Sequence, residues 1–380
     1  MKVVIAIDSL KGSLTSLEAG DAIRRGIHRA DKDASVLVRP LADGGEGTVE
    51  ALTLGMGGSL QKVTVTGPLG SPVEAEYGIL NDGLTAVVEM SAAAGITLIE
   101  EKERNPLLTT TYGVGEMIMD AISKGCRKFI IGIGGSATND GGVGMLQALG
   151  YGILDAEGNQ VAPGAQGLEK IASISDETVT PLLKECSFKI ACDVTNPLCG
   201  ELGCSAVFGP QKGATPEMVK DMDGWLGGFA KIAQAKYEKA DPLYPGTGAA
   251  GGLGYAFLGF TNAVLQSGIS IVLEETKLDD YMKDADIAVT GEGRLDAQTV
   301  MGKAPSGVAD VAKKYGIPVV AFSGAVTEDA VKCNEKGIDA FFPILRSIVT
   351  LDEALDTKNA AHNMTMTVEQ AFRLIKVVKG

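Results

Sequence analysis

Short apolar runs that end in polar, glycine-rich segments recur along this chain of 380 residues. They occur at KVVIAIDSL, KFIIGIGGSATND, FKIACDVTNP, ADIAVTGEGRLD and IPVVAFSGA. Each run is rich in apolar residues, which is typical of a strand buried on both faces, and helical patterns lie between the runs. Strands that alternate with helices in this way predict an α/β fold with mostly parallel sheets. A capping box of Thr15 and Glu18 predicts the start of the first helix.

The length of the chain and one change of pattern indicate two domains. A chain of 380 residues is longer than a single core usually supports. Residues 62–80 and 84–90 alternate and turn at Gly-Pro and Gly-Ser, which is typical of antiparallel strands. We therefore expect domain changes near residues 65 and 285. Thr215 is expected to cap a long amphipathic helix whose Met and aromatic side chains pack in a core.

Composition excludes several classes of function. The formal net charge of −14 disfavours nucleic acid as a partner, because a surface of that sign repels phosphate backbones. The two histidines, His28 and His362, are far apart, and the six cysteines form no C-x-x-C pair, so we expect no zinc site. No apolar run approaches the roughly 18 residues of a membrane span, and the first one is too short for a signal peptide. We expect a cytoplasmic protein without a membrane partner.

Six glycines stand in GIGGSATNDGGVGML, residues 132–146, directly after the predicted strand KFII. Glycine supplies 50 residues of the whole chain, about twice its usual share of roughly 7%. Exposed backbone N–H groups beside hydroxyl side chains are suited to hold a phosphate or a carboxylate. The segment therefore predicts an anion site, and its candidate groups are Gly134, Gly135, Ser136, Thr138 and Asn139.

Two nucleotide-binding motifs are alternatives to an anion site. Gly132, Gly134 and Ala137 fit G-x-G-x-x-A, but that motif needs a helix at once, whereas NDGGVG intervenes and Asp155 stands in a predicted turn. A nicotinamide site is therefore disfavoured. A Walker A loop is absent from the sequence, since AQTVMGKA lacks the first glycine and the final hydroxyl. Another glycine-rich segment, residues 246–254, fits either a second anion site or close backbone packing.

Carboxylates and cations gather in the polar segments that follow the predicted strands. Ligands in open α/β sheets bind beyond the carboxyl ends of the strands, so these segments should meet there. Ordinary turns are the alternative, because Gly, Asp, Asn and Ser accumulate in them for backbone reasons. Five similar segments favour a site with the groups that magnesium-assisted phosphoryl transfer uses. The candidates are Asp8, Ser9, Lys11, Ser13, Asp43, Glu46, Asp193, Thr195, Asn196, Glu292, Arg294, Asp296 and Gln298.

Eight segments closely resemble the type-1 glycerate kinases, bacterial enzymes that phosphorylate glycerate with ATP, generally at the 2-hydroxyl. They are DSLKGSLTSLEA, PLADGGEGT, NPLLTTTYGVGE, GIGGSATNDGG, ACDVTNPLCG, FGPQKGA, GAAGGLG and TGEGRLDAQT, within a likeness that spans residues 1 to 375. The resemblance implies a kinase that uses ATP and Mg²⁺ to convert D-glycerate to 2-phosphoglycerate. It also implies a Rossmann-like domain of residues 1–65 plus 285–380, an inserted flavodoxin-like domain of residues 66–284, and an active cleft between them.

Chemistry, rather than the resemblance, assigns the roles. Arg294 is the candidate fork for a carboxylate or phosphate, or else an ion pair with Glu292 or Asp296. Lys11 is a point charge for the transferring phosphate, unless it is merely solvated. Asp193 is preferred over Asp296 to orient the attacking hydroxyl. The candidate magnesium ligands are Asp43, Glu46 and Glu292. Substrate or phosphate contacts are assigned to Asp8, Ser9, Ser13, Gly134, Gly135, Ser136, Thr138, Asn139, Asn196, Lys212 and Gln298.

Three alternatives to this function stay open at this stage. The product could be 3-phosphoglycerate, or the substrate a related small hydroxy acid. A binding module without turnover would also fit two domains around a cleft, but it gives no reason for so many carboxylates. The oligomeric state is open as well, and a homo-oligomer is one option.

Overall fold

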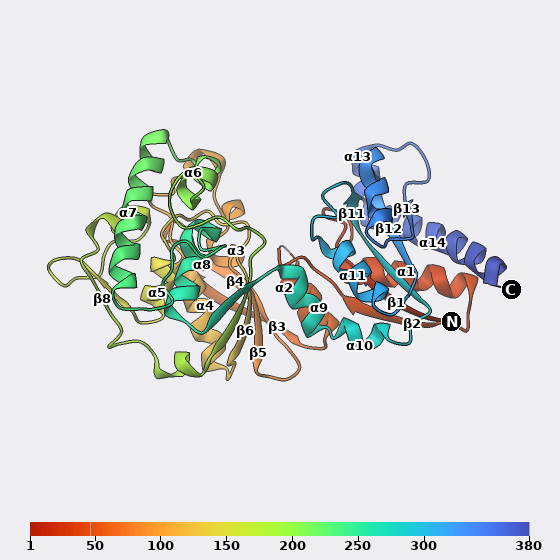
Figure 1. Cartoon of the computed structure of the whole chain (residues 1–380), viewed down its shortest axis with the longest axis horizontal. Coiled ribbons are helices and arrows are strands. Elements are labelled where there is room, and N and C mark those ends of the chain that lie inside the picture. Colours follow the sequence, from red (N-terminus) through yellow and green to blue (C-terminus); the bar gives the residue numbers. More distant parts are fainter. Residues whose placement is uncertain (46, 380) are drawn as a thin grey trace. The chain divides into compact units, whose positions relative to one another are not determined.

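The computed structural model describes residues 1–45 and 47–379, so the candidate Glu46 lies outside the described residues. The chain packs into two compact units. The first comprises Met1–Asp43, Glu50–Met56 and Ile269–Gly380, and the second Gly44–Val49 and Gly57–Gly268 (Figure 1). The domain boundaries near 65 and 285, and a cleft between the domains, stay predictions.

A parallel sheet forms the centre of the first unit. Its five strands lie in the order β13-β12-β11-β1-β2, and every adjacent pair is parallel. Strand β1, between β11 and β2, is buried over Val3, Val4, Ile5, Ala6 and Ile7, which are all apolar. The strands are β1 (Lys2–Ile7), β2 (Ser35–Pro40), β11 (Ile287–Leu295), β12 (Val319–Val326) and β13 (Ala340–Pro343).

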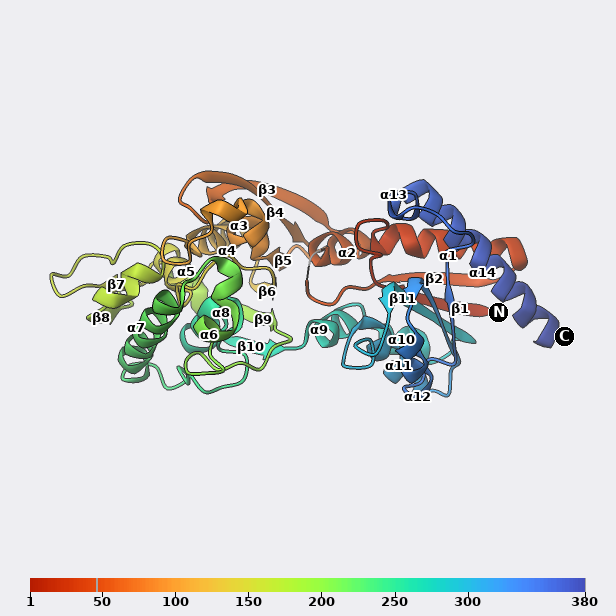
Figure 2. The ribbon, with the colours of Figure 1, turned by 90° about the horizontal axis from the view of Figure 1, so that it is seen from above.

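Helices cover both faces of this sheet, as an α/β fold requires. Figure 2 shows α1 and α14 on one face and α10 and α11 on the other. The predicted capping box of Thr15 and Glu18 is confirmed at the start of α1. The helices are α1 (Ser16–Ala30), most of α2 (Thr48–Gly55), α9 (Gly268–Glu275), α10 (Leu278–Met282), α11 (Ala304–Lys313), α12 (Lys332–Glu335), α13 (Leu351–Leu355), α14 (Thr357–Lys379) and the 3-10 turn Glu328–Val331.

The second unit contains a mixed sheet. Its order is β10-β9-β6-β5-β4-β3, parallel from β10 to β5 and antiparallel from β5 to β3. The antiparallel strands expected within residues 62–90 are thereby confirmed. A two-stranded sheet of β7 (Gly152–Leu154) and β8 (Ser173–Ser175) stands apart. The main strands are β3 (Ser59–Thr66), β4 (Pro72–Ile79), β5 (Thr85–Glu89), β6 (Lys128–Gly132), β9 (Ser187–Ala191) and β10 (Ala263–Gln266).

The longest helix of the second unit, α7, begins where the sequence predicted. Thr215 caps it, and the buried side chains of Met222, Leu226 and Phe229 join the core. The α-helices are α3 (Ser91–Ala94), α4 (Tyr112–Ser123), α5 (Val143–Ala148), α6 (Cys204–Phe208), α7 (Pro216–Gln234) and α8 (Ala249–Phe260). The 3-10 turns are Ile96–Leu98, Glu101–Glu103, Ala165–Lys170, Pro181–Glu185 and Pro210–Lys212.

The predicted loop GEGRLD is in part a continuation of strand β11, which corrects the sequence interpretation. Glu292 and Arg294 pair in parallel register with Ser323 and Ala325 of β12. Continued pairing is possible because Gly291 has no side chain, and a Cβ there would lie 1.8 Å from the Phe322 carbonyl oxygen. Alternate residues of a strand share one face, so Glu292 and Arg294 project to the same side of the sheet.

Candidate functional site

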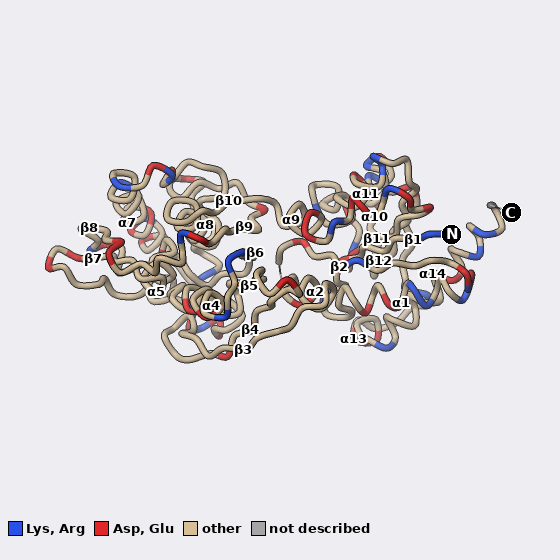
Figure 3. Tube along the Cα trace, turned by 90° about the horizontal axis from the view of Figure 1, so that it is seen from below, with Lys and Arg blue, Asp and Glu red and all other residues tan. Residues whose placement is uncertain are grey.

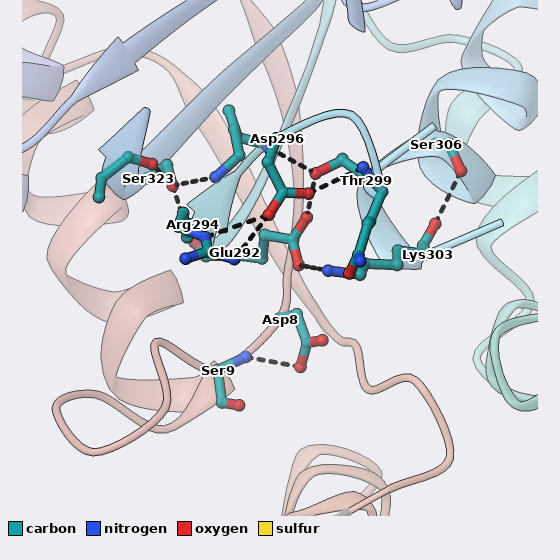
Figure 4. A network of polar contacts seen from close by, with 12 residues as sticks. Asp8, Ser9, Glu292, Arg294, Asp296, Thr299, Lys303, Ser306 and Ser323 are labelled. Carbon is teal, nitrogen blue, oxygen red and sulfur yellow. Dashed lines mark hydrogen bonds and ion pairs between the residues drawn. The ribbon is translucent and has the colours of Figure 1, made fainter. Parts of the chain in front are cut away.

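A pocket of about 420 Å³ lies in the first unit, where strands β1 and β11 end. Acidic and basic side chains meet there, as expected of ligand sites beyond the carboxyl ends of parallel strands. Figure 4 shows Glu292, Arg294, Asp296, Thr299 and Lys303 in one polar network, with Asp8 beside it. The lining residues are Asp8, Ser9, Lys11, Asp43, Glu292, Gly293, Arg294, Asp296 and Lys303.

Asp8 is a buried carboxyl at the end of β1. Its Oδ1 accepts a hydrogen bond from the Ser9 N–H at 2.6 Å. Burial first, and then the charges of Asp43 and Glu292, raise the pKa of Asp8 to about 7, although the Ser9 N–H and Lys11 oppose this. Asp8 is thus a buried carboxyl with two further carboxylates near it, and a bound cation would stabilise its charged form.

Glu292 is held by two groups from the segment that follows its strand. Thr299 Oγ1 donates to Oε1 at 2.6 Å, and the Lys303 ammonium lies 3.6 Å from Oε2. Burial raises the pKa of Glu292, and the Thr299 hydrogen bond and Lys303 only partly oppose it. Glu292 therefore faces the pocket in a fixed orientation.

Arg294 and Asp296 form an ion pair, which was one of the two alternatives for Arg294. Nε and Nη2 lie 3.1 and 3.0 Å from the same oxygen, Oδ2. Burial raises the pKa of Asp296, but the Gln298 N–H, Lys303 and Arg294 outweigh it, so the pKa is lowered. The Arg294 side chain is still 64% exposed, so its remaining N–H groups are available to a ligand.

Lys303 is a pocket residue that sequence reasoning missed. It is the N-cap residue of α11 and its side chain lines the pocket beside Glu292. In the sequence, MGKA is similar only to the end of a Walker A motif, which it fails to match. The overlooked signal was a lysine directly before a helix that carries Pro305 in its first turn and follows GEGRLDAQT.

Two other candidates of the first unit do not line the pocket. Gln298 is exposed, and its backbone N–H rather than its side chain contacts Asp296. The Ser13 hydroxyl is buried and has no hydrogen-bond partner among the described residues. Asp43 does line the pocket.

The predicted anion site of the second unit follows strand β6. Gly134 and Gly135 are exposed, and Gly135 adopts a φ of +72° that favours glycine. Helix α5 begins only at Val143, and the Asp155 N–H donates to the Asn159 carbonyl at 2.9 Å within a turn. Both observations agree with the interpretation that this is no dinucleotide motif.

Buried contacts fix the far side of this glycine loop. The Asp140 carboxylate accepts hydrogen bonds from the Thr111 N–H at 2.8 Å and from the Gly142 N–H at 3.1 Å. The Gly251 carbonyl accepts one from the Gly141 N–H at 2.9 Å, and a Cβ at Gly251 would lie 2.1 Å from the Thr138 carbonyl oxygen. Segment 246–254 therefore serves close backbone packing, one of its two alternatives.

The candidates on this loop differ in their access to solvent. Ser136 is 8% exposed, whereas Thr138 and Asn139 are fully buried. Asn139 Nδ2 donates to Ser205 Oγ at 2.8 Å. Lys212, predicted to touch phosphate, is only 2% exposed and lies behind the loop. The side chains of Thr138 and Asn139 are thus shielded from solvent in this structure.

Asp193 and Asn196 follow strand β9, as expected for candidates at the carboxyl end of a strand. Asp193 is exposed, and its Oδ1 accepts a hydrogen bond from the Gly268 N–H at 3.0 Å. Asn196 Nδ2 donates to the Leu202 carbonyl at 2.8 Å. Both residues, like Ser136 and Lys212, belong to the second unit, whereas the pocket belongs to the first.

Residues 1–45 and 47–379 contain no group of three or more His, Cys, Asp or Glu arranged to hold a metal ion. Magnesium, however, is held in many kinase sites by one or two carboxylates, with water and phosphate oxygens completing its shell. The crowded carboxylates of Asp8, Asp43 and Glu292 fit that requirement. No helix in this part of the chain is both long and apolar enough to span a bilayer.

Comparison with known proteins gives one consistent result. The model of the Glycerate kinase family matches residues 3–376. A glycerate kinase of Haemophilus influenzae is 48% identical over 99% of both chains, and a glycerate 2-kinase of Escherichia coli is 47% identical over 93% of both. A crystal structure from Salmonella typhimurium LT2, described as glycerate kinase 2, is 46% identical, covers 100% of this chain and 99% of its own, and has a TM-score of 0.92.

Proposed function

The chain belongs to the glycerate kinase family, and from that premise we propose that it transfers the γ-phosphoryl group of ATP to D-glycerate, giving 2-phosphoglycerate and ADP. The observation that carries the proposal is the pocket of the first unit. It combines crowded carboxylates with Lys11, Arg294 and Lys303. Those groups are the ones that phosphoryl transfer with a metal ion requires.

We assign the magnesium side of the pocket to Asp8, Asp43 and Glu292. Magnesium, when bound, supplies positive charge to the phosphoryl oxygens of the nucleotide. The carboxylates hold it directly or through water, and Thr299 keeps Glu292 in one orientation for that purpose. Glu46, outside the described residues, stays a candidate ligand on sequence grounds.

The cations of the pocket neutralise the phosphates. Lys11 and Lys303 are point charges, while Arg294 presents a planar fork to an oxygen pair. Asp296 anchors that fork through Oδ2, and its other oxygen accepts the Gln298 N–H at 2.8 Å. Asp296 therefore fixes Arg294 in this proposal rather than orienting the substrate hydroxyl.

Asp193 is assigned to the hydroxyl of glycerate. In this proposal the carboxylate holds the hydroxyl in position and accepts its proton, which leaves late in a loose transition state. The Gly268 N–H and the strand end at β9 hold Asp193 in place. Its exposed carboxylate is accessible to a substrate.

One assay tests both the activity and the position of transfer. The protein is incubated with ATP, magnesium and D-glycerate, and the product is coupled to enolase with and without phosphoglycerate mutase. A 2-kinase gives signal without mutase. Signal only with mutase would mean transfer to the 3-hydroxyl, and no signal in either assay would contradict glycerate phosphorylation.

Measuring the release of ADP distinguishes the remaining alternatives. A kinase for a related small hydroxy acid would release ADP with that acid and not with glycerate. A binding module without turnover would bind glycerate in the absence of nucleotide and would release no ADP. The cytoplasmic location expected from the sequence stays a prediction.

A further inference from the structure

Lys212 is a buried cation whose hydrogen-bond acceptors among the described residues are uncharged. It ends the 3-10 turn Pro210–Lys212 and is 2% exposed. Its ammonium donates to Ser136 Oγ at 2.8 Å and to the Thr138 carbonyl at 2.6 Å. Arg294 and Lys303 in the first unit, by contrast, each contact a carboxylate.

The charges around Lys212 do not neutralise it. Burial lowers its pKa to about 8, opposed by the Cys204 thiol and by Asp140. Asp140 directs its carboxylate to Thr111, Gly142 and Gly144 instead, and burial raises the pKa of Cys204 to about 11. A buried charge without a partner of opposite sign costs several kcal/mol, so a negative ligand near Lys212 would be stabilised.

The backbone of Arg104 lies beside Gly213, the residue that follows Lys212. The Nε of Arg104 is buried without a hydrogen-bond partner among the described residues. Its residue packs on the neighbour of Lys212, because a Cβ at Gly213 would lie 2.3 Å from the Arg104 carbonyl oxygen. Charges of both signs are otherwise distributed along the chain (Figure 3), and the whole chain carries −14.

The hydrogen bond from Lys212 also orients Ser136. Because the hydroxyl oxygen accepts from the ammonium, its own proton points in another direction, and no acceptor for that proton lies among the described residues. The loop beside it is open, since Gly134 is exposed and a Cβ there would meet no atom within 4 Å. Ser136 is therefore a polarised donor that is 8% exposed and directly follows the exposed Gly134 and Gly135.

We infer that Ser136 and Lys212 form an oxyanion subsite of the second unit, in which Ser136 and the N–H groups of Gly134 and Gly135 contact a carboxylate or phosphoryl oxygen. Lys212 is a positioning residue there, which holds Ser136 and supplies the compensating charge from behind. The inference rests on the proposed function, whose two substrates both carry such an oxygen. It replaces the direct phosphate contact that the sequence predicted for Lys212.

The test is calorimetric titration of the full-length protein with D-glycerate and, separately, with a magnesium complex of a non-hydrolysable ATP analogue. Ser136→Ala and Lys212→Met should each weaken one of the two ligands by about 10- to 150-fold, the range expected for a charge-assisted hydrogen bond. The ligand that weakens identifies the source of the oxyanion. Lys220→Met, an exposed lysine of α7, is the matched control and should bind both ligands normally.

Two further readouts separate positioning from a merely structural role. If Lys212 acts through Ser136, the double variant binds about as weakly as the weaker single variant, so the losses are not additive. Wild-type affinity should also fall as the pH rises through about 8, the pKa of Lys212, and this step should vanish in Lys212→Met. Cys204, Asp140 and Arg104 are unchanged in that comparison.

The inference and the proposed function fail in different ways. Wild-type affinity for both ligands in Ser136→Ala and in Lys212→Met would overturn the subsite, even in a protein that phosphorylates glycerate. Fully additive losses would overturn the positioning role of Lys212. If the coupled assay shows no phosphorylation but one ligand still depends on Ser136 and Lys212, the proposed function fails and the subsite stands.

Discussion

The pocket of the first unit and the glycine loop of the second unit differ in the sign of the charge that is buried in them. In the pocket, carboxylates outnumber cations, and the pKa of Asp8 rises to about 7. In the loop, Lys212 has neutral acceptors, and its pKa falls to about 8. Among the described residues, the carboxylates of the pocket therefore exceed its cations, whereas the Lys212 ammonium has no carboxylate as a direct hydrogen-bond partner. The pocket therefore suits a polyphosphate that arrives with a metal ion, whereas the loop suits a free oxyanion.

The largest expected effect concerns Asp193, whose proposed role is chemical rather than electrostatic. Asp193→Asn keeps the shape and removes the proton acceptor, so kcat should fall by about 10² to 10⁴, while affinity for MgATP stays nearly unchanged. Steady-state kinetics with a separate nucleotide titration measures both quantities. Asp241→Asn is the control, because Asp241 is exposed and also accepts a backbone N–H, from Leu243 at 2.9 Å. A full kcat, or a loss confined to MgATP binding, would refute the assignment.

The next effect concerns the stability of the pocket without ligand. The folded-state pKa of Asp8 is raised, so its ionisation destabilises the fold as the pH rises from about 4 through about 7. Asp8→Asn should therefore be more stable than wild type at pH 8, by about 2 to 4 kcal/mol, and equal to it near pH 4. Urea unfolding at the two pH values measures this difference.

Asp296 supplies the opposite control in the same pocket. Its folded-state pKa is lowered, so its charge stabilises the fold above the unfolded pKa, and this contribution is lost as the pH falls through the folded value. Asp296→Asn should therefore lose stability at pH 8. If both variants shift stability in the same direction at pH 8, the description of the pocket as crowded near Asp8 and paired at Asp296 is wrong.

The fold was largely predictable, because strand patterns and capping signals are local. The strands at residues 2–7 and 128–132 and the capped starts of α1 and α7 follow from such signals. Side-chain access was not predictable, because distant segments determine it. Residues 246–254 pack on Thr138, and Ser205 covers Asn139, so two polar candidates of the loop are buried.

The sequence predicted which residues form the candidate site better than it predicted the role of each one. Asp8, Lys11, Asp43, Glu292, Arg294 and Asp296 were all named from the sequence, and the structure brings them to one pocket. Lys303 was missed because a single lysine before a helix carries little information without the fold. Arg294 pairs with Asp296 rather than Glu292 because of the backbone geometry at the end of β11, which the spacing of these residues in the sequence does not determine.

Lys303 gives the third expected effect and tests the cationic side of the pocket. Lys303→Met removes a point charge beside Glu292, so the KM for ATP should rise by about 10- to 150-fold, with a smaller change in the KM for glycerate. The matched control is Lys313→Met at the other end of α11, where the lysine pairs with Asp339 at 2.6 Å, away from the pocket. Equal KM values for ATP in the two variants would remove Lys303 from the site.

The smallest expected effect probes the open edge of the glycine loop. Gly134 does not adopt a positive φ, and a Cβ there would meet no protein atom within 4 Å, so Gly134→Ala should leave the free energy of unfolding within about 1 kcal/mol of wild type. The added methyl group would instead stand where an oxyanion approaches the backbone, and affinity for that ligand should fall by roughly tenfold, about 1.4 kcal/mol.

Gly224→Ala is the control, because Gly224 lies on α7 and its Cβ would also meet no atom within 4 Å. Alanine there should stabilise the helix slightly and leave binding unchanged. If Gly134→Ala binds glycerate and the ATP analogue as tightly as Gly224→Ala does, the loop's open edge is not a ligand surface, and the contrast between the two regions reduces to a matter of protein packing.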